Sequence, residues 1–166
     1  YNFFIIVGPE SDPAGVKDMS PGDALQTLYD EGLTGNVLWV SRGDNSGTHS
    51  KETGLWKATG FDLDAIKAET SESGELWYIE AGAGMTATLQ LTNEKEAYTL
   101  TDMATYLKNY KNGNIELVAI VGQGKETLNV YAAVLCNPEE NPRGMYDGAQ
   151  LFMEYILGEE VQDMLV

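Results

Sequence analysis

The sequence predicts an α/β domain, because short apolar runs typical of strands alternate with segments whose apolar residues have helical spacing. Apolar residues make up 43% and charged residues 22% of the 166 residues, which are the proportions of a folded globular protein. The length suits one domain with a core of its own. We therefore expect a mixed, largely parallel sheet that is flanked by helices.

The chain is expected to open with a strand, because residues 1–7 (YNFFIIV) are aromatic and β-branched and end at Gly8. This strand begins without a turn or a cap, which suggests a piece of a longer protein. Ser20 and Pro21 are an N-cap and a first helical residue, and the helix that they start is expected to end before Gly32. The elements that follow are a buried strand at 36–40, helices at about 46–56 and 62–69, and a strand at 76–79.

The second half is expected to continue the alternation after a glycine-rich turn at 81–84, with a helix that begins near Met85. A final helical stretch covers about 146–165. Between the helix that begins near Met85 and this final stretch, the expected elements are a strand at 98–100, a helix at about 102–110, and strands at 115–121 and 129–135. The apolar residues of the final stretch are Ala149, Phe152, Met153, Ile156, Val161 and Leu165.

The charge of the chain excludes one class of partner. With 10 Lys and Arg against 26 Asp and Glu the net charge is −16, which repels the backbone of nucleic acids, so no nucleic-acid partner is expected. An oxyanion is repelled as well, but salt screens charges beyond about 8 Å. A local arrangement of donors is therefore sufficient for an anion site.

Cys136 is the single cysteine, which excludes an internal disulfide and a multi-cysteine metal site. It lies in the apolar run YAAVLC, so we expect a buried structural thiol. The acidic residues lack the spacing of a calcium loop, so no metal site is expected. No apolar stretch approaches the roughly 20 residues of a membrane span, and no signal peptide is recognisable.

Two segments share one construction, in which a strand runs into a turn rich in Gly, Ser and Thr and a helix starts there. They are residues 41–48 (SRGDNSGT) and 81–86 (AGAGMT). Free N–H groups and the positive end of the helix dipole make a helix start an anion site. Ligands of α/β sheets bind beyond the carboxyl ends of the strands, where both turns are expected.

The first turn adds Arg42, whose planar guanidinium can pair with two oxygens of a tetrahedral dianion. Hydroxyl groups at Ser41, Ser46 and Thr48 can donate further hydrogen bonds. The same pattern also fits a structural turn, in which Ser46 caps the helix and Arg42 pairs with Asp44. Both interpretations remain open from the residues alone.

Other chemistries fit the sequence less well. The first turn lacks the GxxxxGK[ST] spacing of a nucleotide-binding loop, and residues 82–84 lack the third glycine of a dinucleotide fingerprint, so no cofactor is expected. His49 is near Ser46, Ser50 and Asp44, which are the residue types of a hydrolase triad. Neighbours at a helix start do not thereby form a proton relay, and no GxSxG elbow is present. The sequence therefore predicts a binding protein and not an enzyme.

Residues 41–52 (SRGDNSGTHSKE), with Leu55 and Trp56 after them, resemble the signature segment of tungstate-binding proteins from ABC transporters. The resemblance covers nearly the whole chain, because further similar segments follow in the family's order. They are residues 1–9, 12–15, 77–78, 84–89, 93–95, 97–102 and 137–138.

The resemblance implies a two-lobed, type II periplasmic-binding-protein fold, of which this chain is one lobe with its crossover strands. The implied parts are an outgoing crossover strand at 1–7, the second lobe at 8–128, a return crossover strand at 129–136 and a C-terminal helical segment of the first lobe at 137–166. The implied function is the substrate-binding component of an importer that delivers tungstate, molybdate or a related oxyanion to an ABC permease without chemistry. Its implied location is extracytoplasmic, either periplasmic or lipid-anchored at the cell surface.

The resemblance also implies which residues bind the oxyanion. Arg42 is the charged ligand, and the residues around it are Ser41, Ser46, Gly47 and Thr48. By analogy with molybdate-binding relatives, Met85, Thr86 and Thr99 face the same cleft. The family's first lobe adds a Thr/Ser-rich turn, and no Thr-Thr-Thr-Ser run occurs here, so this chain is expected to bind tungstate weakly or not at all.

Three further expectations come from the resemblance. A ligand-sensing domain of a transcriptional or signalling regulator is the alternative function, because similar lobes occur in such proteins. An enzyme on this fold needs a reactive cysteine or a base in the cleft, which Cys136 and His49 do not supply. Without the sheet of a first lobe, the apolar face around Phe152 and Ile156 is expected to form a homodimer, or the terminal strand and helix are expected to exchange between two copies.

Overall fold

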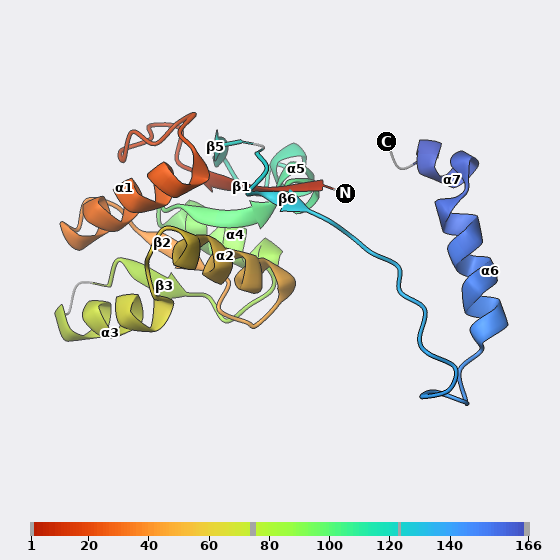
Figure 1. Ribbon diagram of the computed structural model, residues 1–166. Coiled ribbons are helices and arrows are strands. Elements are labelled where there is room, and N and C mark those ends of the chain that lie inside the picture. Colours follow the sequence, from red (N-terminus) through yellow and green to blue (C-terminus); the bar gives the residue numbers. More distant parts are fainter. Residues whose placement is uncertain (1, 74–75, 123, 165–166) are drawn as a thin grey trace. The chain divides into compact units, whose positions relative to one another are not determined.

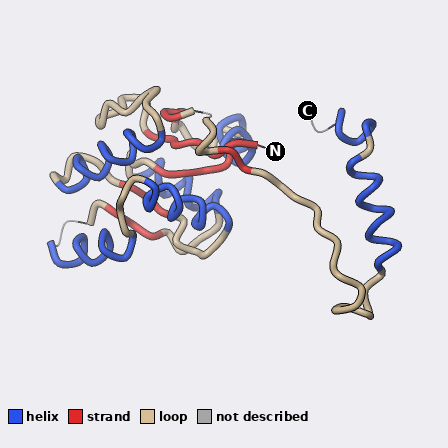
Figure 2. Tube along the Cα trace, in the orientation of Figure 1, coloured by secondary structure: helices blue, strands red, loops and turns tan. Residues whose placement is uncertain are grey.

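The protein's structure, a computed structural model, describes residues 2–73, 76–122 and 124–164 (Figure 1). It falls into two units, Tyr1–Asn129 and Val130–Val166. Strands with helices around them form the first unit, and the second contains two helices and irregular segments (Figure 2). The sequence predictions for Tyr1 and Leu165 lie outside the described residues.

The sheet of the first unit is mixed. Its strands are β1 (Asn2–Gly8), β2 (Trp39–Ser41), β3 (Tyr78–Glu80), β4 (Thr99–Asp102), β5 (Val118–Val121) and β6 (Leu128–Asn129). β1 pairs antiparallel with β4, β5 and β6, whereas β2 pairs parallel with β3. A parallel bridge between Trp39 and Tyr98 joins β2 to the start of β4. Strands β2 to β6 therefore share one direction and β1 runs against them, which confirms the predicted mixed, largely parallel sheet.

The helices of the first unit begin mostly where the sequence provides a cap. They are α1 (Pro21–Leu33), α2 (Gly47–Ala58), α3 (Leu63–Ser73), α4 (Met85–Glu94) and α5 (Met103–Lys111). The side chains of Ser20, Ser46 and Asp102 accept hydrogen bonds from the first turns of α1, α2 and α5. These caps satisfy N–H groups that the helix itself leaves free.

Alternate residues of β1 supply two cores, one on each face of the sheet. Phe4 and Ile6 pack into a cluster with residues of α1, α2 and α3. Ile5 and Val7 pack on the other face with residues of α4 and α5. The helices are therefore divided between the two faces, and α2, α4 and α5 follow closely on the carboxyl ends of β2, β3 and β4.

Helix α1 continues past Gly32, where the sequence predicted that it would have ended. Trp77 packs against this glycine, and a Cβ at this position would lie 2.5 Å from the Trp77 ring. Gly32 is buried inside the helix. The glycine therefore permits close approach of an aromatic ring and does not mark the helix end.

The strand predicted at 129–135 is wrong beyond its first residue. β6 ends at Asn129, and residues 130–135 have no regular structure. β6 pairs with β1 through Asn129 and Leu128, which lie opposite Asn2 and Phe3. Cys136, which was predicted to be buried, is exposed. The apolar run therefore predicted a longer strand and a buried thiol, and the structure has neither at these residues.

The final helical stretch consists of two helices, α6 (Tyr146–Leu157) and α7 (Glu159–Met164). The break is at Gly158, whose backbone is extended with ψ 145°. Large apolar side chains of α6 are exposed, among them Leu151, Phe152 and Tyr155. Within the described part of the chain, the structure has no helix with both the length and the apolar character needed to cross a membrane.

Candidate functional site

The two predicted anion-binding turns lie side by side, because β2 and β3 are neighbouring parallel strands. The first turn follows β2 and leads into α2, and the second follows β3 and leads into α4. The N–H of Ala81 donates to the carbonyl oxygen of Ser41 at 2.9 Å, which joins the two turns directly. The structure thus brings together both segments that the sequence singled out.

The first turn is tight because two of its residues adopt left-handed backbone angles. Gly43 has φ 61° and Asn45 has φ 57°, and these residue types tolerate that region best. The hydroxyl of Ser46 then accepts a hydrogen bond from the His49 N–H at 3.3 Å and caps α2. Gly47 is the exposed first residue of this helix, so the helix start is accessible from solvent.

Arg42 is held at the start of this turn by two side chains. Its Nε lies 2.8 Å from Oδ2 of Asp44, and its Nη1 donates to Oγ1 of Thr48 at 3.5 Å. The side chain and N–H of Ser46, together with Arg42, lower the pKa of Asp44 and keep its carboxylate ionised. The Ser46 cap and the Arg42–Asp44 pair of the structural interpretation are therefore both present. A guanidinium has five N–H donors, so these contacts orient Arg42 and leave donors for an anion.

A buried carboxyl group, Glu52, lies beneath the first turn. It is 2% exposed and accepts hydrogen bonds from Trp39 Nε1 at 2.9 Å, Ser41 Oγ at 2.8 Å and the Tyr78 hydroxyl at 2.8 Å. Burial raises the pKa of Glu52, although the three donors oppose that rise. Ser41, predicted as a ligand, is fully buried and engaged with this carboxyl group.

Glu52 was missed as a functional residue by the sequence reasoning, although the signal was present. Thr48, Glu52, Leu55 and Trp56 are the buried residues of α2. They recur at the spacing of one helix face, so a carboxyl group on that face must have partners in the core. The sequence pattern by itself does not identify these partners, because they come from two strands.

The second turn offers a helix start without a side-chain cap. Gly82 has φ 59°, and Gly84 precedes α4 without any side-chain hydrogen bond to the helix start. Met85 is buried, whereas Thr86 is exposed and its Oγ1 accepts from Asn109 Nδ2 at 3.3 Å. The free N–H groups at the start of α4 are therefore the stronger feature of this turn for binding an anion.

Thr99, predicted to face the same cleft, is fully buried at the start of β4. Its hydroxyl donates to the carbonyl oxygen of Val40 at 2.6 Å. This hydrogen bond fixes β4 against β2 just below the first turn.

His49, the centre of the hydrolase alternative, accepts a hydrogen bond through Nδ1 from the Asn45 N–H at 3.1 Å. Its imidazole therefore stabilises the first turn.

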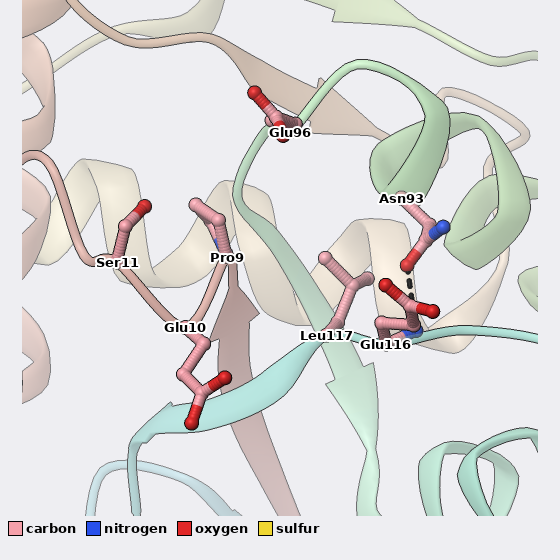
Figure 3. A pocket seen from close by; sticks show the side chains of 7 residues that line it. All are labelled: Pro9, Glu10, Ser11, Asn93, Glu96, Glu116 and Leu117. Atoms are coloured by element: carbon pink, nitrogen blue, oxygen red, sulfur yellow. Dashed lines mark hydrogen bonds between the residues drawn. The ribbon is translucent and has the colours of Figure 1, made fainter.

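A hollow lies beyond the carboxyl end of β1, beside the C-terminal end of α4 (Figure 3). Its volume is about 280 Å³, and its lining includes Glu10, Glu96 and Glu116. The side-chain oxygen of Asn93 accepts from the Glu116 N–H at 2.7 Å. Three carboxylates repel an oxyanion, so this hollow does not compete with the paired turns as an anion site.

Residues 1–160 match the family model of the PBP superfamily domain. The chain belongs to the PBP superfamily. The fold and the strand-to-helix turns agree with this membership, and the predicted periplasmic-binding-protein-like lobe is confirmed.

Two curated relatives of this PBP-superfamily chain match along almost its whole length. The tungstate-binding protein TupA of Peptoclostridium acidaminophilum is 34% identical over 168 residues, which cover 99% of this chain and 53% of the relative. A putative ABC transporter anion-binding protein of Haloferax volcanii is 35% identical, with 99% and 45% covered. The chain therefore spans about half the length of the curated relatives that it matches.

A solved structure extends the similarity to three dimensions. The tungstate-binding protein TupA from Desulfovibrio alaskensis G20 superimposes with a TM-score of 0.79 at 37% identity, and the match covers 99% of this chain and 62% of that one. The resemblance that the sequence suggested is confirmed at the level of the family.

Proposed function

We propose that this chain is the substrate-binding component, or a lobe of it, of an ABC importer for tungstate or a related tetrahedral oxyanion. The observation that carries the proposal is the pair of helix starts that follow β2 and β3, with Arg42 beside them. Two relatives named for tungstate or anion binding support the choice of ligand class. Binding occurs without chemistry, and the delivery partner is an ABC permease.

In this proposal Arg42 is the charged ligand, and N–H groups at the two helix starts complete the donor set. Gly47, Ser46 and Thr48 supply the first helix start, and Met85 with Thr86 supplies the second. Buried Ser41 and Thr99 contribute from beneath, because their hydroxyls hold β2 and the first turn in place. The location that fits such a component is extracytoplasmic.

Isothermal titration calorimetry of the chain with sodium tungstate, molybdate, sulfate and phosphate tests the proposal. We expect saturable 1:1 binding of tungstate, and the titration should extend to millimolar anion so that weak binding is detected. The comparison of the four anions also establishes selectivity, which depends on cavity size. Absence of saturable heat with all four anions would contradict the proposal.

We also propose that the apolar side of α6 mediates association of two copies of the chain. Leu151, Phe152 and Tyr155 are 67%, 63% and 65% exposed. Large apolar side chains gathered on one helix mark an interaction surface, and identical surfaces pair by two-fold symmetry.

A further inference from the structure

Ser41 connects the buried Glu52 carboxyl group to the turn that carries Arg42. Its Oγ donates to Glu52 Oε2 at 2.8 Å and accepts from the Gly43 N–H at 3.2 Å. These two hydrogen bonds hold Ser41 Oγ between the Glu52 carboxyl group and the Gly43 N–H. The backbone of Arg42 therefore lies between Ser41 and Gly43, and the hydrogen bond that joins these two residues depends on Glu52.

Gly43 leaves this turn little freedom to shift. Its φ is 61°, and a Cβ at this position would lie 2.8 Å from the Cβ of Glu80 on β3. The turn is thus pressed against the neighbouring strand on one side and hydrogen-bonded to Ser41 on the other. Arg42 projects from a backbone segment that is fixed at both ends.

The same carboxyl group also links the second turn to the first. Tyr78, which donates to Glu52, is on β3, three residues before Ala81. The N–H of Ala81 donates to the carbonyl oxygen of Ser41 at 2.9 Å. Trp39 and Ser41 are two positions apart on β2 and therefore point to the same face, toward Glu52. One carboxyl group on α2 thus binds residues of both strands that lead into the turns.

We propose that Glu52 is a positioning residue of the oxyanion site, which sets the place of Arg42 through Ser41 and keeps the two turns in register. This inference rests on the proposed oxyanion-binding function. Glu52 does not touch the anion, because it is buried beneath the turn. Its effect on binding is geometric, since an anion site works only when its donors are held within about 0.5 Å of their productive places.

Two substitutions of Glu52 separate geometry from charge. Glu52→Gln keeps an oxygen that accepts from Trp39 and Tyr78, and its amide N–H can donate to Ser41 Oγ. Position 52 then still contacts all three side chains, with the direction of the Ser41 hydrogen bond reversed. Glu52→Ala leaves all three side-chain donors without their acceptor. Position is therefore retained in the amide variant and lost in the alanine variant.

The experiment titrates sodium tungstate into the wild-type chain, Glu52→Gln, Glu52→Ala and the control Leu28→Ala by calorimetry. Leu28 is a fully buried core residue of α1, so its truncation destabilises the fold without touching the turns. We expect Glu52→Ala to bind about tenfold more weakly, and Glu52→Gln to stay within about threefold of the wild type. Leu28→Ala should bind as the wild type does when it is measured well below its melting temperature.

Amide hydrogen exchange of Gly43, followed by NMR without any anion, gives a readout that is independent of ligand. It should be faster in Glu52→Ala and unchanged in Glu52→Gln. Wild-type affinity together with a wild-type exchange rate of the Gly43 amide in Glu52→Ala overturns the inference. An equal loss of tungstate affinity in Glu52→Gln and Glu52→Ala also overturns it. If Glu52→Ala does not fold, Ser41→Ala removes the connection alone, and wild-type affinity in that variant overturns the inference as well. If the wild-type chain binds no tungstate, the proposed function fails, and the Gly43 exchange rates still decide the positioning role.

Discussion

At the scale of single residues, the guanidinium of Arg42 carries the proposed charge recognition. We expect Arg42→Lys to weaken tungstate binding by roughly 1–3 kcal/mol, because a lysine keeps the charge but loses the planar fork and its contacts with Asp44 and Thr48. Calorimetry with tungstate measures the loss. The matched control is Arg143→Lys, since Arg143 is the second arginine of the chain and is exposed outside the turns. Equal affinity of Arg42→Lys and the wild type would remove Arg42 from the site.

Glu52 makes a separate prediction about stability and pH. Burial raises its pKa above the ordinary value of 4.5 in the folded protein, so the folded state binds this proton more tightly than the unfolded state does. The contribution of this raised pKa to the free energy of unfolding is then fully present below pH 4.5, and it is lost as the pH rises through the folded pKa. Each tenfold difference between the two dissociation constants corresponds to about 1.4 kcal/mol.

The side chain at position 52 cannot ionise in the Glu52→Gln variant. The free energy of unfolding of this variant should therefore rise relative to that of the wild type as the pH increases from 4.5. Urea unfolding of both proteins at a series of pH values measures this difference, because all other titrating groups are shared. Parallel pH profiles for the two proteins would show that the carboxyl group has the same pKa folded and unfolded.

At the scale of elements, the start of α2 has an open position that the anion is proposed to approach. A Cβ at Gly47 meets no atom within 4 Å, so Gly47→Val should leave the fold intact while its branched side chain hinders access to the N–H groups. We expect weaker tungstate binding by calorimetry with little change in melting temperature.

Gly54→Val is the matched control, because Gly54 is an exposed residue of the same helix and also has open space around it. It should bind tungstate as the wild type does. Normal binding by Gly47→Val would favour the interpretation of this turn as a helix cap alone.

At the scale of the whole molecule, the exposed apolar side of α6 predicts self-association. The chain should exceed its monomer mass of 18.1 kDa in light scattering at high concentration. Phe152→Gln with Ile156→Gln should restore the monomer, because the association buries apolar surface. Leu107→Gln is the control, since Leu107 is an exposed apolar residue of α5 in the first unit. A clean monomer at high concentration would exclude the homodimer.

The sequence alone determined the order and type of most elements and the two strand-to-helix turns. These are local properties: caps such as Ser46, glycines such as Gly43 and the alternating apolar residues of β1 act over a few positions along the chain. Family resemblance could be recognised for the same reason, because residues 41–52 form one continuous segment.

Only the tertiary structure decided the relations that cross between elements. The parallel pairing of β2 and β3 brings the turns together, and the three donors to Glu52 come from residues 13, 11 and 26 positions away. The structure also shows that residues 130–135 have no regular structure and that Cys136 is exposed, which the apolar run had predicted otherwise. Hydrogen-bond partners and buried neighbours depend on the packing of segments distant in the sequence, whereas caps, turns and periodicity depend on adjacent residues.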